Sequence, residues 1–178
     1  MKATGIVRRI DDLGRVVIPK EIRRVLRIRD GDPLEIFTDR DGEVIFRKYS
    51  PVGEMHKFAQ ELCDTMARVS GHTVAVTDRD AVIACAGPLR KELMDKKVGH
   101  ELETLMEERQ SRFNKSGDQG IPITDGGGPK ALAMVPIIVL GDITGSALFF
   151  GTEQDVCTET EVKLCQTIAT FLSKQIES

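Results

Sequence analysis

The first 48 residues constrain the fold most, because they carry a full series of short elements in a stretch too small for a self-contained core. Modules of this size usually need a disulfide, a metal or a partner chain. The four cysteines and three histidines show neither a paired-cysteine nor a metal-ligand spacing. The sequence therefore predicts that this module folds as a dimer.

The elements of this module follow the order β-β-α-β-β. β-branched runs predict strands, and a turn signal at Asp11-Asp12-Leu13-Gly14 separates the first two. Pro19 suits the opening of the helix, and the loop ending in Asp41-Gly42 predicts a hairpin. In chain order, the predicted elements are Thr4–Ile10, Arg15–Ile18, Lys20–Arg27, Leu34–Thr38 and Val44–Arg47.

A Pro- and Gly-containing segment marks a boundary after this module. We assign residues 1–50 to the first domain, 51–54 to a linker and 55–178 to a second domain. Apolar periodicity predicts helices over 55–69, 89–94, 101–109 and 158–176, and strands over 73–77, 81–86, 131–140 and 143–150. Thr158 and Glu161 have the spacing of a capping box at the start of the last helix.

Charge is distributed unevenly along the chain. The net charge of −3 combines a positive module, with 12 Lys and Arg against 9 Asp and Glu in residues 1–50, and a negative remainder. Such asymmetry indicates a nucleic-acid-binding module. The longest apolar run, Ala131–Leu140, is interrupted by Pro136, and the N-terminus lacks the apolar segment of a signal peptide. We expect a cytoplasmic, nucleoid-associated protein with no membrane partner.

The basic module resembles a known family. The run from Leu13 to Arg24, LGRVVIPKEIRR, is similar to the swapped-hairpin domain of AbrB-type transition-state regulators. The resemblance implies an α+β chain in which two copies interleave their hairpins into one β-barrel homodimer that binds double-stranded DNA. Within this family the full length is most similar to sporulation regulators, which implies an activator or repressor of sporulation genes.

The resemblance also implies which residues contact DNA. The matching positions are Arg8, Arg15, Arg23 and Arg24, and Arg9, Lys20 and Arg27 are expected to add phosphate contacts. Arginine offers a planar fork for phosphate or for guanine edges. Because the predicted helix spans only about two turns, we expect substantial readout of DNA shape and an A/T-biased preference.

Residues 55–178 resemble a GAF-like α/β sensor domain, through AVTDRDAVIACAG and AMVPIIVLGDITGSALFF. The resemblance implies a small-molecule pocket with residues 114–130 as its lid, although no cofactor is evident and the ligand is unidentified. Gly126–Gly128 lacks the lysine and hydroxyl of a phosphate-binding loop, and the scattered histidines predict no metal site. Apolar faces on 55–69 and 158–176 favour a second dimer contact, and hence a homotetramer.

Two alternative functions remain open at this point. Antitoxins of toxin–antitoxin pairs use the same N-terminal module, but they follow it with a disordered acidic tail, whereas residues 55–178 are periodic. A thiol-dependent reductase built on the GAF-like domain would need a reactive cysteine, for which Cys85 is the one candidate. No cysteine is paired or flanked by histidine, so we expect no catalytic residue and no enzyme activity.

Overall fold

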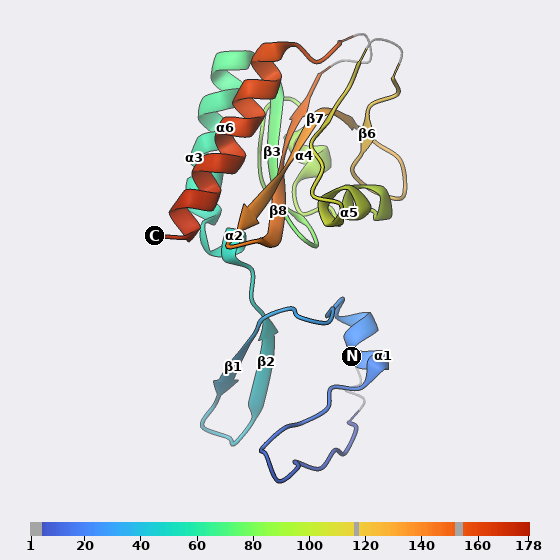
Figure 1. The fold of residues 1–178 in the computed structure, drawn as a ribbon, viewed down its shortest axis with the longest axis vertical. Coiled ribbons are helices and arrows are strands. Elements are labelled where there is room, and N and C mark those ends of the chain that lie inside the picture. The colour runs from blue at the N-terminus through green and yellow to red at the C-terminus, as the bar shows by residue number, and fades with distance from the viewer. Residues whose placement is uncertain (1–4, 116–117, 152–154) are drawn as a thin grey trace. The chain divides into compact units, whose positions relative to one another are not determined.

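The computed structural model describes residues 5–115, 118–151 and 155–178. The chain divides into two compact units, Met1–Tyr49 and Ser50–Ser178, each with its own secondary structure (Figure 1). Among the described residues, no helix is both long and apolar enough to cross a membrane.

The described residues of the N-terminal unit, 5–49, form one short helix and one hairpin. Helix α1 is Lys20–Val25, and strand β1, Leu34–Thr38, pairs antiparallel with β2, Val44–Lys48. The Asp39 carboxylate closes the hairpin loop by accepting the N–H groups of Asp41 (3.0 Å) and Glu43 (2.8 Å). The predicted helix and hairpin are therefore confirmed.

The two predicted strands before α1 are absent from the described residues 5–18, so this part of the prediction is wrong for the single chain; Thr4 lies outside the described residues. A β-branched run forms a strand only where a neighbouring strand satisfies its backbone groups. Within residues 5–18, the recorded backbone bonds belong to a single turn between Asp11 and Arg15.

This unit has almost no interior. Among the described residues 5–49, Pro19 alone is buried. Large apolar side chains lie exposed instead: Ile6, Val7, Ile10, Leu13, Val16, Val17, Val25, Leu26, Ile36, Phe37, Val44, Ile45 and Phe46. Since apolar burial is the main driving force of folding, a single copy lacks the core that would hold these elements together.

The C-terminal unit is an antiparallel sheet in the order β4-β3-β8-β7-β5, with β6 paired to β7. Two helices cover one face, and two shorter helices lie on the other (Figure 1). The strands are β3 Thr73–Asp78, β4 Val82–Ala86, β5 Arg112–Phe113, β6 Ile121–Pro122, β7 Lys130–Val139 and β8 Asp142–Phe150. The long helices are α3 His56–Ser70 and α6 Glu159–Ile176, and the short ones are α4 Arg90–Leu93 and α5 His100–Glu107.

The central strands bury side chains on both faces, which builds two apolar cores. Phe149 of β8 packs in the core beneath α3 and α6, together with Leu172. Its neighbours Leu148 and Phe150 point to the opposite face and pack with Leu102 of α5. The alternation of strand side chains thus divides the apolar residues of β8 between the two layers.

The segment predicted as a linker is instead a short helix, α2 Pro51–Glu54. Ser50 caps it by accepting the N–H of Gly53 (3.0 Å), and the Ser50 hydroxyl also donates to Asp78 (3.1 Å). Val52 is fully buried. Proline at the first turn and burial of Val52 against the rest of this unit account for the helix.

The capping box at the start of α6 is confirmed. The Thr158 side chain accepts the N–H of Thr160 (3.3 Å), and the Glu161 carboxylate accepts both the backbone N–H of Thr158 (2.8 Å) and its hydroxyl proton. Although burial of Glu161 raises the pKa of its carboxyl, the hydrogen bonds from Thr158 and the neighbouring His72 outweigh burial and lower that pKa below its ordinary value.

Replacing Glu161 with alanine is expected to lower the free energy of unfolding at pH 7 by about 1 kcal/mol. Because the folded-state pKa is lowered, the charged carboxylate stabilises the fold above its ordinary pKa, and this contribution is lost as the pH falls through the lower folded value. Urea unfolding of both proteins at pH 7 and pH 4 measures the difference. Glu159→Ala, at an exposed position in the same helical turn, is the control; an equal loss in both variants would contradict the capping role.

Candidate nucleic-acid interface

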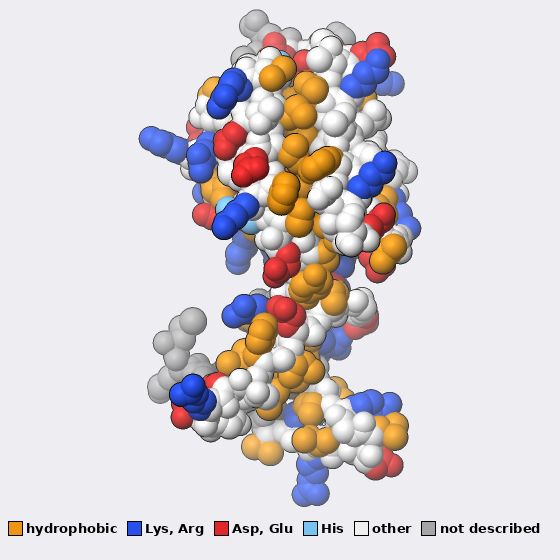
Figure 2. Space-filling model, turned by 90° about the vertical axis from the view of Figure 1, so that its left-hand side faces the viewer, with side chains coloured by type: hydrophobic (Ala, Val, Ile, Leu, Met, Phe, Trp, Pro, Cys, Tyr) orange, Lys and Arg blue, Asp and Glu red, His pale blue; other side chains and the backbone are white. Residues whose placement is uncertain are grey.

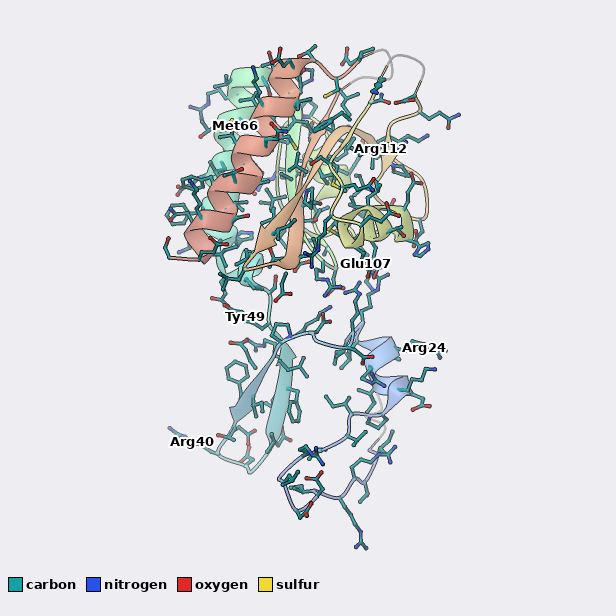
Figure 3. The ribbon with its side chains drawn as sticks, viewed as in Figure 1. Arg24, Arg40, Tyr49, Met66, Glu107 and Arg112 are labelled. Atoms are coloured by element: carbon teal, nitrogen blue, oxygen red, sulfur yellow. The ribbon has the colours of Figure 1, made fainter. Side chains whose placement is uncertain are left out.

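The predicted DNA-contacting residues all lie in the N-terminal unit, in two groups. Arg8, Arg9 and Arg15 belong to the irregular segment before α1. Lys20, Arg23 and Arg24 lie on α1, which begins after Pro19, whose φ of −56° suits a helix start; Figure 3 labels Arg24 on this helix. Arg27 follows α1 with a positive φ of 51°.

Arg15 is tied to a turn that its own neighbours form. Its Nε donates to Oδ2 of Asp11 at 2.7 Å, and its backbone N–H donates to Oδ1 of Asp11 at 2.7 Å. The two hydrogen bonds from Arg15 lower the pKa of the Asp11 carboxyl, and the bond from the backbone N–H has the larger effect. Asp11 therefore stays ionised at neutral pH, and the Arg15 guanidinium has a fixed neighbour although it is largely exposed.

Arg23 is engaged within the chain. Its Nη1 lies 2.6 Å from Oδ1 of Asp30, in the loop after α1. Its buried Nε has no hydrogen-bond partner in the part of the chain that the structure describes. Arg23 thus joins the helix to the following loop and leaves only part of its guanidinium available for another ligand.

The remaining predicted cations differ in their surroundings. The side chains of four cations are exposed and form no hydrogen bond or ion pair with the described residues: Arg8, Arg9, Lys20 and Arg24. Arg27 is half-buried, and its carbonyl accepts a hydrogen bond from Lys48 Nζ (2.8 Å). The exposed guanidinium and ammonium groups are the ones most available to phosphate oxygens.

Sequence reasoning missed the two acidic partners. Asp11 and Arg15 flank the predicted turn, so the turn itself could have indicated that their side chains meet. Asp30 is seven residues from Arg23 and meets it only because the chain turns back after α1, so no local pattern indicated it.

The C-terminal unit contains a pocket of about 720 Å³. Its lining combines apolar and polar groups, and it includes part of the segment expected to act as a lid. Lining residues include His72, Leu89, Glu92, Asn114, Lys130 and Phe150. Within the described residues, no three His, Cys, Asp or Glu side chains gather in a way that could hold a metal ion.

The four cysteines are free. Cys63, Cys85 and Cys165 are buried, and Cys157 is half-buried. Burial raises the pKa of Cys85 to about 11 and raises that of the other three thiols as well. Gln60 of α3 further encloses Cys85, because its amide accepts the backbone N–H of Cys85 (3.2 Å) and donates to the carbonyl (3.1 Å). A protonated, enclosed thiol is a poor nucleophile.

Thiol labelling of the native full-length protein with a soluble disulfide reagent is expected to modify only Cys157, and slowly, because the other three thiols are buried. All four thiols should react once the chain is unfolded. Cys157→Ser should then remove the native signal. Rapid labelling of Cys85 in that variant would contradict the assignment of this thiol as unreactive.

Comparison with known proteins defines the class. Residues 7–54 match the family described as antidote-toxin recognition MazE, bacterial antitoxin. The transition state regulatory protein AbrB of Bacillus subtilis (strain 168) is 59% identical over 51 residues, which cover 29% of this chain and 52% of that protein. The GAF domain of an Acinetobacter phosphoenolpyruvate-protein phosphotransferase, 12% identical, covers 68% of this chain and 81% of its own, with a TM-score of 0.53. The chain is thus an AbrB-type module joined to a GAF-like fold, an architecture of the α+β class.

Full-length similarity then identifies the family. Residues 54–177 match the family described as stage V sporulation protein T C-terminal, transcription factor. Stage V sporulation protein T of Bacillus subtilis (strain 168) is 48% identical over 179 residues, which cover 99% of both chains. This chain belongs to the stage V sporulation protein T family of transcription factors.

Proposed function

We propose that this chain is a regulator of sporulation genes that binds double-stranded DNA through a homodimer of its N-terminal unit. The observation that carries the proposal is the group of exposed, unengaged cations among the described residues of a module 59% identical to part of AbrB. Cations of this kind supply the phosphate contacts that dominate affinity for DNA.

The homodimer follows from the missing core. Thirteen large apolar side chains among the described residues 5–49 are exposed in the single chain. Pairing two copies would bury them, and it would give residues 6–10 and 15–18 the strand neighbours that they lack. Each DNA-contacting arginine would then occur twice on one surface, which matches the two-fold symmetry of a dimer on DNA.

We assign direct DNA contact to Arg8, Arg15, Arg23 and Arg24, with Arg9, Lys20 and Arg27 in supporting phosphate contacts. The exposed side chains of Arg8 and Arg24 are the best placed of these. Arg23 would contact DNA with the part of its guanidinium that Asp30 does not occupy. Readout would rest on DNA shape as well as base edges, because α1 is only six residues long.

The C-terminal unit would assemble or modulate the regulator. Apolar side chains gather along the face formed by α3 and α6 (Figure 2). Phe58, Val69 and Phe171 are exposed on these helices. Pairing of this face with a second copy would join two N-terminal dimers into a homotetramer, on the nucleoid in the cytoplasm. The 720 Å³ pocket supports binding of a small molecule, and the enclosed cysteines support a regulator rather than an enzyme.

DNA-binding measurements with an arginine variant test the proposal. Replacing Arg24 with alanine is expected to weaken binding of a labelled A/T-rich duplex by about 10- to 100-fold, as loss of a good arginine contact does. If Arg24 contacts phosphate, the slope of log K against log salt should also flatten by about 2, because a dimer loses two contacts. Fluorescence anisotropy over a salt series measures both. Arg40→Ala, in the exposed hairpin loop, is the matched control, and equal effects in the two variants would refute the assignment of Arg24.

A further inference from the structure

The carboxylate of Asp11 has two separate tasks in the turn before α1. Its Oδ1 accepts the backbone N–H groups of Leu13 (3.0 Å) and Arg15 (2.7 Å), which shapes the turn. Its Oδ2 accepts the Arg15 Nε–H at 2.7 Å, which fixes the side chain. We propose that Asp11 is a positioning residue that presents the two terminal nitrogens of Arg15 to DNA; this inference rests on the proposed DNA contact of Arg15.

The geometry leaves the two Nη groups of the Arg15 guanidinium available to a ligand. A guanidinium has one inner N–H, on Nε, and four outer N–H groups, on the two Nη atoms. Asp11 takes the inner one, and no interaction of the outer groups is recorded with the described residues. The Nη pair is the part of the guanidinium that reaches furthest from the backbone, where phosphate oxygens or guanine edges would lie.

Hydrogen bonds within the turn restrain the position of Arg15. Asp11 and Arg15 are also joined through the backbone, since the N–H of Asp11 donates to the carbonyl of Arg15 (3.1 Å). Gly14 donates to the Asp11 carbonyl (3.0 Å) and has a φ of +77°, which a glycine adopts readily. An exposed arginine usually loses much rotamer freedom on binding a ligand. Arg15, with 71% of its side chain exposed, is already restrained before DNA arrives.

Asp12 provides a matched comparison. It is exposed, adjacent to Asp11, and has no recorded partner among the described residues. A carboxylate close to DNA repels phosphate, so neutralising it should leave affinity unchanged or raise it. If Asp11 positions Arg15, neutralising Asp11 should instead lower affinity. The two neighbouring residues therefore give effects of opposite sign.

The experiment measures DNA affinity of the full-length protein by anisotropy in a double-mutant cycle. Asp11→Asn retains an oxygen that can accept the turn N–H groups but loses the ion pair with Arg15. We expect Asp11→Asn to weaken binding by about 5- to 20-fold in the wild-type background and by less than about 2-fold in the Arg15→Ala background, as coupled residues do. Asp12→Asn should leave binding unchanged or tighten it.

Two outcomes would overturn the inference, and a third would overturn its basis. Equal weakening by Asp11→Asn with and without Arg15 would mean that Asp11 only shapes the turn. Tightening by Asp11→Asn, as expected for Asp12→Asn, would mean that Asp11 merely repels DNA. If Arg15→Ala itself leaves affinity unchanged, the proposed contact of Arg15 fails, and the positioning role fails with it. Arg15→Lys provides an independent background, since lysine keeps the charge but has a single ammonium, which cannot pair with Asp11 and present a separate pair of nitrogens to DNA; Asp11→Asn is therefore not expected to weaken binding there.

Discussion

Replacing Ile36 with lysine is expected to abolish assembly of the N-terminal unit and, with it, DNA binding. Ile36 lies opposite Phe46 in the hairpin, and 65% of its surface is exposed in the single chain. In a dimer that buries this pair, burial of each Ile36 contributes about 1.5–3 kcal/mol to the free energy of association, and each dimer contains two copies of Ile36. A lysine at the same site would also bury an unpaired charge. We expect the DNA affinity to fall by at least about 1000-fold.

Lysine makes this test specific, because an added positive charge should by itself favour DNA binding. A loss of binding therefore cannot come from repulsion between the new side chain and phosphate. Leu140→Lys is the control, since it also replaces an exposed aliphatic side chain with lysine, in a turn of the C-terminal unit. Native mass spectrometry reports the assembly, and anisotropy reports the affinity. Retained assembly and full affinity in Ile36→Lys would show that the hairpin is not buried between copies.

Replacing Gly145 with alanine is expected to destabilise the C-terminal unit by about 3 kcal/mol or more, a change of over 100-fold in its folding equilibrium. Gly145 lies in β8 between Asp78 of β3 and Ile137 of β7. A Cβ atom there would stand 2.0 Å from the carbonyl oxygen of Thr77, which is backbone and cannot rotate away. The pairing of β8 with β7 is irregular beside this position, between Ile137 and Ile138, and a glycine in a strand is typical of such a close approach of backbones.

Thermal unfolding followed by circular dichroism measures this effect, with an expected fall of roughly 10 °C in Tm. Gly126→Ala is the matched control, because a Cβ at Gly126 meets no atom within 4 Å and Gly126 has no positive φ. The control should melt within about 2 °C of the wild type. A normal Tm for Gly145→Ala would mean that the sheet opens at low cost, and that the close approach to Thr77 is not a fixed feature of the fold.

The parts of the fold that were predictable are those with a local periodic signal. The apolar stripe of α3, the long hairpin of β7 and β8, and the capping box at Thr158 are each encoded within one segment. The two-residue strands β5 and β6 are too short to show any period. Helix α2 resembles a linker in composition, and it forms because Val52 finds a buried site in the C-terminal unit.

In the candidate DNA-binding site too, the residues could be predicted from local sequence, but their contacts could not. Four of the seven cations were predicted because they match family positions, and the other three because they lie beside those positions in a basic module. Their roles as DNA contacts stay a prediction. What the sequence could not reveal is how each is held, since Arg23 meets Asp30 only after the chain turns, whereas Arg24, one residue later, is exposed. A strand prediction before α1 could not succeed within one chain, because strand formation depends on a neighbour as well as on residue type.

The position of α6 also sets the timing of folding during synthesis. This helix supplies Cys165, Ile168 and Leu172 to the core that α3 and the central strands share, yet it follows every strand in the sequence. Its 18 residues take about one to four seconds to translate at roughly 5–20 residues per second. Until α6 has been made and has left the ribosome, the core that it shares with α3 lacks its last helix, and one apolar face of the sheet is incompletely covered. The interval before α6 joins the sheet is therefore the period in which this chain is most exposed to aggregation.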